Sequence, residues 1–206
     1  MKVLIINGSP RKDGNCETLI KELVKTFNEF NVETNILKIG GLDISGCKGC
    51  GYCATHDGCV LKDIVNDSYK LLEEANGVIL VSPVYYASPN GTLLAFLDRL
   101  FYSAKVDRRM KVGASFAVAR RAGTVSTFDV LNKYFTISGM PLASGDYWNN
   151  SFGGAKGEDI NDLEGFRNVR IVAKRMVFLM NAINDAKDKY KDLFDDEPRA
   201  RTSYIR

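Results

Sequence analysis

Apolar and polar positions along the chain alternate between two periods. Short apolar runs of strand type are followed by segments in which apolar residues recur every three or four positions, as they do on one face of a helix. The predicted strands cover residues 3–7, 32–38, 77–82 and 111–119, and a weak fifth strand begins near Leu142. The predicted helices cover a first segment with Leu19, Leu23 and Phe27 on its apolar face, and then residues 63–75, 92–102, 125–137 and 163–189.

Alternating strands and helices are typical of parallel sheets whose right-handed crossover helices cover both faces. The pattern therefore predicts the α/β class, as a flavodoxin-like, doubly wound, five-stranded parallel sheet with helices on both faces. No internal repeat or low-complexity linker divides the chain, so we expect a single domain over residues 1–206. This domain would carry a cysteine-rich insertion at 46–59 and a C-terminal helix and tail at 163–206.

Two segments do not fit the alternation. The glycine-rich stretch 144–157 is predicted to be a surface excursion. The tail 195–206 is too polar for a core, although Tyr204 and Ile205 are candidates for docking on a neighbouring subunit. Because ligands of open parallel sheets bind at the carboxyl ends of the strands, we expect the site in the loops after strands one, three and four.

Charge and length exclude several classes of protein. The 206 residues carry 28 Lys and Arg against 25 Asp and Glu, a net charge of +3 that is evenly spread and argues against nucleic acid as a partner. No apolar run reaches the ~18 residues of a membrane helix, and no signal peptide precedes the first strand, so we expect no membrane partner and a cytoplasmic, reducing location. A chain of this length buries roughly 70% of its unfolded surface, so it needs no disulfide or metal merely to fold.

The loop after the first strand reads Asn-Gly-Ser-Pro-Arg-Lys-Asp-Gly-Asn over residues 7–15. Its glycines allow a tight turn, and the amides of the following helix attract an anion, so it has the properties of a phosphate cradle. It is neither a Walker A loop nor a G-x-G-x-x-G turn. An ordinary polar turn with a solvated Arg11 is the alternative.

Gly8-Ser9-Pro10-Arg11-Lys12 with Gly14-Asn15 resembles the FMN phosphate loop of the NADPH-dependent FMN reductase and iron–sulfur flavoprotein families. The resemblance implies that Ser9, Arg11, Gly14, Asn15 and Cys16 bind FMN. Those families usually have Ser or Thr where this chain has Cys16. The cysteine removes a hydroxyl donor and leaves a backbone amide and a weak S–H.

The loop after the third strand, Ser-Pro-Val-Tyr-Tyr-Ala-Ser-Pro-Asn over residues 82–90, is stiff and offers flat apolar faces. It is similar to the S-P-x-Y segment of the same flavoproteins. The resemblance implies that Pro83, Val84, Tyr85 and Tyr86 border the isoalloxazine ring. The alternative is a tight turn whose tyrosines pack on the core or on a dimer interface.

The loop after the fourth strand also resembles a flavin-contacting segment of the iron–sulfur flavoproteins. It supplies Arg120, Arg121, Ala122 and Gly123 as cofactor-binding residues. Reduction of a flavin places negative charge near N1 and O2, so Arg120 or the neighbouring amides would stabilise the reduced form. The alternative leaves both arginines facing solvent.

Four of the five cysteines, Cys47, Cys50, Cys53 and Cys59, follow a C-x2-C-x2-C-x5-C spacing. In a reducing compartment such clustering indicates a metal or redox centre, and glycines between the thiols permit the turns that a cuboidal cluster requires. The last gap is longer than in bacterial ferredoxins. The spacing resembles the compact cysteine motif of iron–sulfur flavoproteins, which implies a [4Fe-4S] cluster.

The cysteine spacing leaves other chemistry open. Four thiolates also suit zinc, and either C-x2-C pair suits dithiol chemistry, while a vestigial site with free thiols is the remaining alternative. His56 lies in the same segment but is left out of the ligand set, because a loop histidine near a metal is more often solvated.

Together these loops resemble an FMN-dependent oxidoreductase of the iron–sulfur flavoprotein type. We expect FMN, a [4Fe-4S] cluster, and NAD(P)H or a low-potential donor such as ferredoxin, with a small-molecule or protein acceptor. No catalytic acid, base or nucleophile is expected, because the flavin carries the reaction. The alternatives are an electron carrier without nicotinamide activity and a zinc-stabilised binding module. The family resemblance also implies a homodimer or homotetramer.

Overall fold

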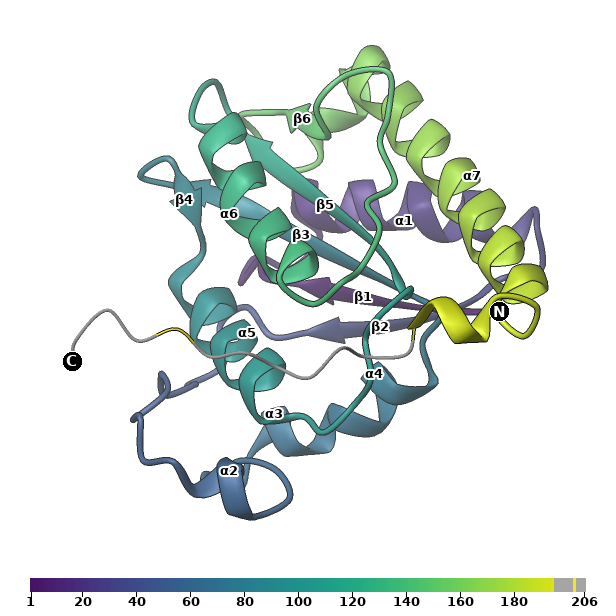
Figure 1. Cartoon of the computed structure of the whole chain (residues 1–206). Coiled ribbons are helices and arrows are strands. Elements are labelled where there is room, and N and C mark those ends of the chain that lie inside the picture. Colours follow the sequence, from purple (N-terminus) through teal and green to yellow (C-terminus); the bar gives the residue numbers. More distant parts are fainter. Residues whose placement is uncertain (195–201, 203–206) are drawn as a thin grey trace.

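The computed structural model describes residues 1–194 and 202, and a parallel sheet forms its centre (Figure 1). The sheet order is β2-β1-β3-β5-β6, and every neighbouring pair in it is parallel. This is the doubly wound order in which the first strand lies inside the sheet, so the flavodoxin-like prediction is confirmed. The strands are β1 (Lys2–Asn7), β2 (Glu33–Lys38), β3 (Gly77–Tyr85), β5 (Val112–Ala119) and β6 (Asn150–Phe152).

A sixth strand, β4 (Ser88–Pro89), pairs antiparallel with the end of β3. The expected number of parallel strands is therefore right, and the additional strand is a short hairpin extension. It forms because the chain reverses at Tyr86 and Ala87 and returns along β3 before entering the next helix.

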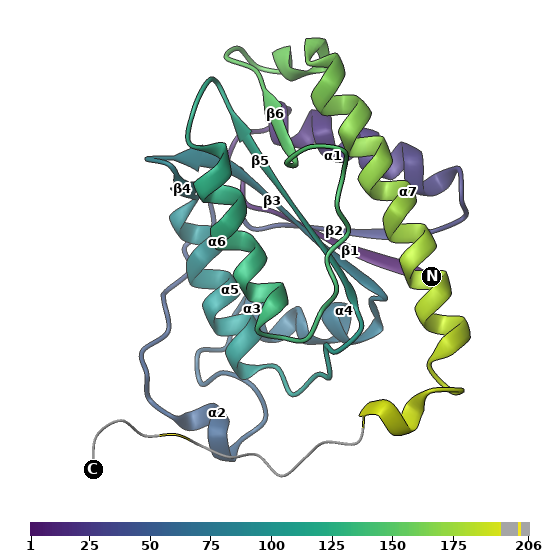
Figure 2. The ribbon, with the colours of Figure 1, turned by 45° about the horizontal axis from the view of Figure 1, so that its top comes forward.

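Helices cover both faces of the sheet, as Figure 1 and the rotated view in Figure 2 show. One face carries α1 (Asn15–Asn28) and α7 (Leu163–Ala186). The helices of the other face are α3 (Ile64–Asp67), α4 (Tyr69–Glu74), α5 (Gly91–Ser103) and α6 (Thr124–Thr136). Three short helices lie outside these layers: α2 (Tyr52–Thr55), η1 (Glu158–Asn161) and η2 (Lys191–Phe194).

Alternation along the central strands supplies both cores. Val3 and Ile5 pack with α1 and α7, whereas Leu4 and Ile6 point to the opposite face and pack with α5 and α6. Successive side chains of a strand point to opposite faces, so a strand buried on both faces is a continuous apolar run. This geometry explains why β1 and β3 are the clearest strands in the sequence.

The weak fifth strand near Leu142 is a wrong prediction. Leu142 forms only an isolated bridge with Gly113, and the edge strand β6 begins at Asn150. The same finding corrects the predicted surface excursion 144–157, since this stretch contains β6 and a fully buried Ser151. The error arises because the residues of β6 are mostly polar and carry no apolar signal.

The predicted helix 63–75 is also corrected. It is interrupted at Ser68, whose hydroxyl donates to the Ile64 carbonyl at 2.6 Å, so that α3 ends and α4 begins there. A serine hydroxyl that bonds back to the preceding turn competes with the helical ladder. The predicted positions of α5, α6 and α7 agree with the structure to within a few residues.

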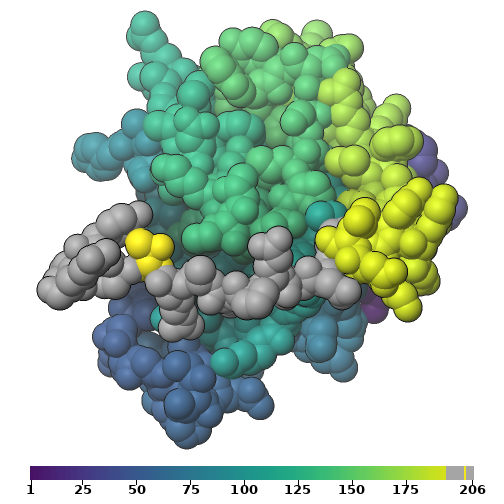
Figure 3. All heavy atoms as spheres, in the orientation of Figure 1, coloured from purple at the N-terminus to yellow at the C-terminus, as the bar shows by residue number. Residues whose placement is uncertain are grey.

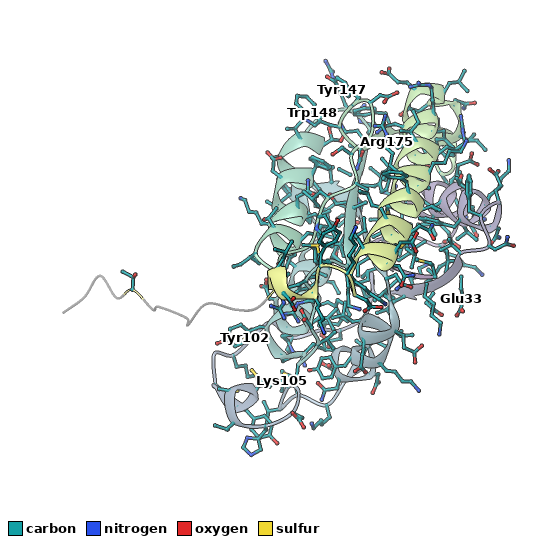
Figure 4. All side chains as sticks on the ribbon, turned by 45° about the vertical axis from the view of Figure 1, so that its right-hand side comes forward. Glu33, Tyr102, Lys105, Tyr147, Trp148 and Arg175 are labelled. Carbon is teal, nitrogen blue, oxygen red and sulfur yellow. The ribbon has the colours of Figure 1, made fainter. Side chains whose placement is uncertain are left out.

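The cysteine segment leaves the sheet after β2 and forms a lobe beside α5, seen in blue at the bottom of Figure 3. At the opposite end of the molecule Tyr147 and Trp148 point outward, while Tyr102 lies beside the lobe (Figure 4). Tyr204 and Ile205, the predicted docking residues, lie outside the described residues. Within residues 1–194 and 202, no helix is long and apolar enough to cross a bilayer.

Candidate functional site

A cleft of about 230 Å³ lies where four loops meet at the carboxyl edge of the sheet. The three predicted loops contribute to it, together with a fourth that follows β6. The lining residues are Ser9, Arg11, Gly14, Asn15, Cys16, Pro83, Val84, Tyr85, Val118, Ala119, Arg120, Gly153, Gly154 and Lys156. The structure thus brings nine of the thirteen predicted cofactor-binding residues into one cleft.

The first loop is folded by its own polar side chains. The Asn7 side chain accepts from the Ser9 amide at 2.9 Å, and the Ser9 hydroxyl accepts from the Arg11 amide at 3.3 Å. Helix α1 then begins after Gly14, and among the residues that the structure describes no side chain caps its first amides. An uncapped helix N-terminus carries partial positive charge and free N–H donors, so this end of the cleft suits an anion.

Cys16 lines the cleft and also belongs to the core. Its side chain is buried among apolar residues of α1 such as Leu19 and Ile20. Burial raises the pKa of the Cys16 thiol to about 12, so the side chain is neutral at pH 7. A neutral thiol places no negative charge beside the anion-binding end of the cleft.

The fourth loop joins the cleft through Asn15. The Asn15 Nδ2 group donates to the Gly153 carbonyl at 2.8 Å, while its buried Oδ1 has no partner among the described residues. A methyl group on Gly153 would lie 2.7 Å from that Nδ2. Sequence reasoning missed Gly153, Gly154 and Lys156 because it placed the last strand too early. The sequence feature that marks this loop is the Gly153-Gly154 pair, which directly follows a strand that ends at the carboxyl edge of the sheet.

A buried carboxyl group lies behind this loop. Asp159 is fully buried, its Oδ2 accepts a long hydrogen bond from Ser151 at 3.5 Å, and its Oδ1 has no partner among the described residues. Burial raises the pKa of Asp159 to about 6. The group therefore carries its negative charge at pH 7 at a cost to the folded state.

The hairpin between β3 and β4 separates the two predicted tyrosines. Tyr85 lines the cleft, whereas Tyr86 is fully exposed at the turn. Tyr86 and Ala87 have φ values of 49° and 56°, which non-glycine residues adopt only with strain. The Ser126 hydroxyl donates to the Ala87 carbonyl at 2.6 Å and so ties the turn to α6.

The loop after β5 is divided in the same way. Arg120 lines the cleft, but Arg121, Ala122 and Gly123 do not. Arg121 and Ala122 are exposed, and Gly123 packs against the hairpin with a φ of 86°. With Arg11 and Lys156, Arg120 makes the cleft electropositive.

A second cavity of about 570 Å³ lies between the cysteine segment, α5 and α6. All four predicted metal ligands line it: Cys47, Cys50, Cys53 and Cys59. The sulfurs share the cavity, but within residues 1–194 and 202 no three metal-ligating side chains are close enough to form a metal site. A four-thiolate ligand set therefore remains a prediction.

Local geometry separates His56 from this cavity. Gly49 and Gly51 take positive φ angles of 62° and 72°, and α2 begins directly after the second of them. The His56 ring stacks on Tyr52 with centroids 4.0 Å apart and is exposed. His56 is not among the residues that line the cavity.

The cysteine segment is attached to the fold by Arg99 of α5, a residue that the sequence analysis did not single out. Its side chain is only 1% exposed, and its guanidinium pairs with both carboxylate oxygens of Asp63 at 2.7 and 3.0 Å. Hydrogen bonds from Arg99 and from Val65 lower the pKa of Asp63, although partial burial opposes them. The available signal was a charged residue on the apolar stripe of a helix.

Comparison with known proteins agrees with this arrangement of loops. Residues 1–154 match the NADPH-dependent FMN reductase family. The chain belongs to this family. An iron–sulfur flavoprotein of Methanosarcina thermophila is 32% identical over 194 residues, which cover 92% of this chain and 100% of the relative. An iron–sulfur flavoprotein of Methanocaldococcus jannaschii is 31% identical over 192 residues, which cover 89% of this chain and 99% of the relative.

Solved structures show the same fold at low sequence identity. The structure of RosB with a bound flavin phosphate intermediate has a TM-score of 0.67 and 13% identity, with 100% of this chain and 92% of that chain covered. The apo form of an NADH:FMN oxidoreductase has a TM-score of 0.62 and 16% identity, with 88% and 89% covered. These structures support the flavodoxin-like fold of this family member.

Proposed function

We propose that this protein is an FMN-dependent oxidoreductase of the iron–sulfur flavoprotein type. It would move electrons between NAD(P)H or a low-potential donor such as ferredoxin, FMN and a [4Fe-4S] cluster, and on to a small-molecule or protein acceptor. The observation that carries the proposal is the electropositive cleft at the uncapped start of α1, together with the family match.

The residues of the cleft fit an FMN phosphate. Ser9, Arg11 and the amides at the start of α1 offer hydrogen-bond donors and positive charge. The buried Asn15 Oδ1 has no hydrogen-bond partner among the described residues and is a further acceptor at this end of the cleft. At about 230 Å³ the cleft is smaller than the roughly 300–1,000 Å³ of most ligand pockets, so it would enclose only part of FMN. Pro83, Val84 and Tyr85 would then border the ring at its rim.

Bound FMN would supply hydride and single-electron chemistry. The chain itself needs to bind, orient and stabilise charge. Arg120 is an exposed cation at the lining of the cleft and would stabilise the negative charge of the reduced cofactor. Cys16 stays neutral and does not oppose that charge.

The proposed cluster ligands are Cys47, Cys50, Cys53 and Cys59. What supports this proposal is the donor set, four thiols along one cavity, and two relatives named iron–sulfur flavoproteins. Thiolates are the usual ligands of such clusters. Assembly as a homodimer or homotetramer is part of the proposal.

Anaerobic purification followed by FMN, iron and acid-labile sulfide analysis tests both cofactors. One FMN and about four irons and sulfides per chain are expected. Stoichiometric zinc without sulfide would show that the four cysteines bind a structural metal and no cluster. A colourless protein after FMN addition would contradict the flavin site. Rapid reduction by NADPH or NADH is expected, whereas reduction by ferredoxin alone would assign the electron-carrier function.

Replacement of Arg120 tests the proposed charge stabilisation. Arg120→Ala is expected to lower the flavin midpoint potential, because a cation that favours the reduced form is lost. Arg121→Ala is the matched control, since it removes a neighbouring exposed cation outside the cleft. Equal potentials in the two variants would remove Arg120 from this role.

A further inference from the structure

Arg99 of α5 joins the two stretches of chain that flank the cysteine segment through one guanidinium. It donates to the carbonyls of Ser45 at 3.2 Å and Leu61 at 3.0 Å and pairs with Asp63. Its Nε and Nη2 groups also lie 3.4 Å from Cys59 Sγ. The planar guanidinium is suited to such forked contacts, which an ammonium group cannot reproduce.

Cys59 differs from the other three cysteines in how firmly it is held. Its amide donates to Tyr69 Oη at 2.9 Å and to Asn66 Oδ1 at 3.2 Å, and its carbonyl accepts from Asn66 Nδ2 at 3.0 Å. Tyr69 is in turn bonded to Ser103 of α5 at 2.6 Å. Cys59 is therefore fixed on both its backbone and its sulfur.

Two of the other cysteines lie in a more open environment. Cys47 and Cys50 are exposed, whereas Cys53, in the short helix α2, is half-buried as Cys59 is. Around Gly46, Gly49 and Gly51 no described atom beyond the chain neighbours lies within 4 Å of the position of an added methyl group. Three potential ligands thus lie on a loosely packed segment, and one lies on a rigid support.

We propose that Arg99 is the positioning residue of the four-cysteine site. It holds Cys59 as the pre-placed ligand around which the other three thiolates gather, and its two N–H groups stabilise the negative charge that the site gains on accepting one electron. This inference rests on the proposed function in assuming that the four cysteines bind a redox metal centre. The electron comes from the donor of the proposed function, NAD(P)H or a low-potential ferredoxin, by way of FMN, and the step makes no bond and moves no proton.

The charge effect follows from burial. A guanidinium that is 1% exposed is screened less by solvent than a surface cation, although its partner Asp63 is 32% exposed, so a change of one unit of charge at Cys59 is felt across the 3.4 Å contacts. N–H donors to the sulfur ligands of a cluster are a recognised control of its potential. Asp63 neutralises part of the guanidinium charge but leaves the two N–H groups directed at the sulfur.

Arg108 provides a matched control in the same cavity. It lies over the Phe101 ring at 5.7 Å and donates to the Ala104 carbonyl at 3.2 Å, and within residues 1–194 and 202 it makes no hydrogen bond to a cysteine. Arg108→Gln removes a nearby cation without touching a ligand.

Two Arg99 variants separate charge from geometry. Arg99→Lys keeps the positive charge but loses the forked hydrogen bonds. Arg99→Gln combined with Asp63→Asn removes both charges without leaving the Asp63 carboxylate unpaired. The first measurement is the affinity of the metal-free protein for Co²⁺ alone, read from its thiolate charge-transfer bands. Both Arg99 variants are expected to bind Co²⁺ about 10-fold or more weakly, because a hydrogen bond to a charged group is lost. Arg108→Gln is expected to bind Co²⁺ with the affinity of the wild-type protein.

The second measurement is the potential of the iron-loaded protein, followed by EPR-monitored titration. In both Arg99 variants the equilibrium constant for one-electron reduction of the metal site is expected to fall about 10-fold. This corresponds to a midpoint potential lower by about 59 mV. Unchanged potentials in loaded variants, or unchanged Co²⁺ affinity, would overturn the role of Arg99. Wild-type protein that binds Co²⁺ but no iron and sulfide would instead overturn the proposed cluster.

Discussion

The cleft and the cysteine cavity are built in opposite ways. Around the cleft, backbone packs directly on backbone: a methyl group on Gly40 would lie 2.2 Å from the carbonyl carbon of Ser9, and one on Gly153 would lie 2.5 Å from the Asp159 nitrogen. In the cysteine segment, glycines such as Gly46 have open space around them, and side chains provide the attachment.

This difference separates a preformed site from an adaptable one. The shape of the cleft is set when the sheet and its loops pack, so its residues are in place before any ligand arrives. The cysteine segment is anchored near Arg99 and Cys59 but is loosely packed between residues 46 and 51, so a bound metal can still decide its final form. Substitutions should therefore affect the two regions very differently.

The largest expected effect comes from a matched pair of glycines. Gly40→Ala forces a methyl group into the backbone of Ser9 and should destabilise the protein by about 3 kcal/mol or more, beyond the usual range for overpacking. Gly46→Ala meets no neighbour and should change stability by less than about 0.5 kcal/mol. Denaturant unfolding of both variants measures the contrast, and similar losses would contradict it.

Next in size is the loss of a cation from the cleft. Arg11→Gln should weaken FMN binding about 10- to 100-fold, because a charged hydrogen bond to phosphate is lost, and should leave the unfolding of the FMN-free protein unchanged. Lys12→Gln removes a neighbouring exposed charge outside the cleft and is the control. Fluorescence titration with FMN gives both affinities, and equal losses would show only general electrostatic attraction.

Asp159→Asn should stabilise the protein above pH 6 by about 1–3 kcal/mol. The folded pKa of Asp159 is raised to about 6, above an unfolded value of about 3.9, so the folded state binds more protons between these pH values. The free energy of unfolding of the wild-type protein therefore falls as pH rises from about 4 to 6. In Asp159→Asn the free energy of unfolding does not fall for this reason.

The pH dependence provides the check on Asp159. Unfolding at pH 4 should show little advantage for Asp159→Asn, whereas unfolding at pH 7 should show all of it. Asp129→Asn neutralises an exposed carboxylate on α6 and should show no such difference. An advantage that is equal at both pH values would mean that packing, not charge, explains it.

The smallest effect concerns the hairpin beside the cleft. Ala87→Gly relieves a φ of 56° and should stabilise the protein by about 0.5–1 kcal/mol. Thermal unfolding measures the gain. Ala155→Gly, in an exposed loop without a positive φ, is the control and should give no gain. A loss of stability in Ala87→Gly would show that the bracing from α6 already offsets the strain.

Most of the fold could be predicted because its central strands are buried on both faces. Residues 3–6 and 78–81 are continuous apolar runs, and the helices repeat their apolar residues at regular spacing. The edge strand β6 could not be found in this way, since Asn150 and Ser151 are polar yet buried. Their burial depends on pairing with β5 and on packing against α7 and η1, which no local pattern records.

The candidate site was predicted where local chemistry marks it. Ser9, Arg11 and Arg120 stand in loops with clear composition and meet in the cleft. Which of two neighbouring residues enters the cleft, Tyr85 or Tyr86, depends on the turn between β3 and β4 and so on tertiary structure. Arg99 was missed for a related reason, because its partner Asp63 lies 36 residues away in the sequence.

The ion pair between Arg99 and Asp63 also bears on how this chain can evolve. A descendant that lost Asp63 together with the cysteine segment would leave the Arg99 guanidinium without its carboxylate partner and without the neighbouring Leu61 carbonyl. The arginine and the segment are therefore expected to be inherited or lost as a unit. Relatives with a shortened segment should carry an uncharged residue at the position of Arg99.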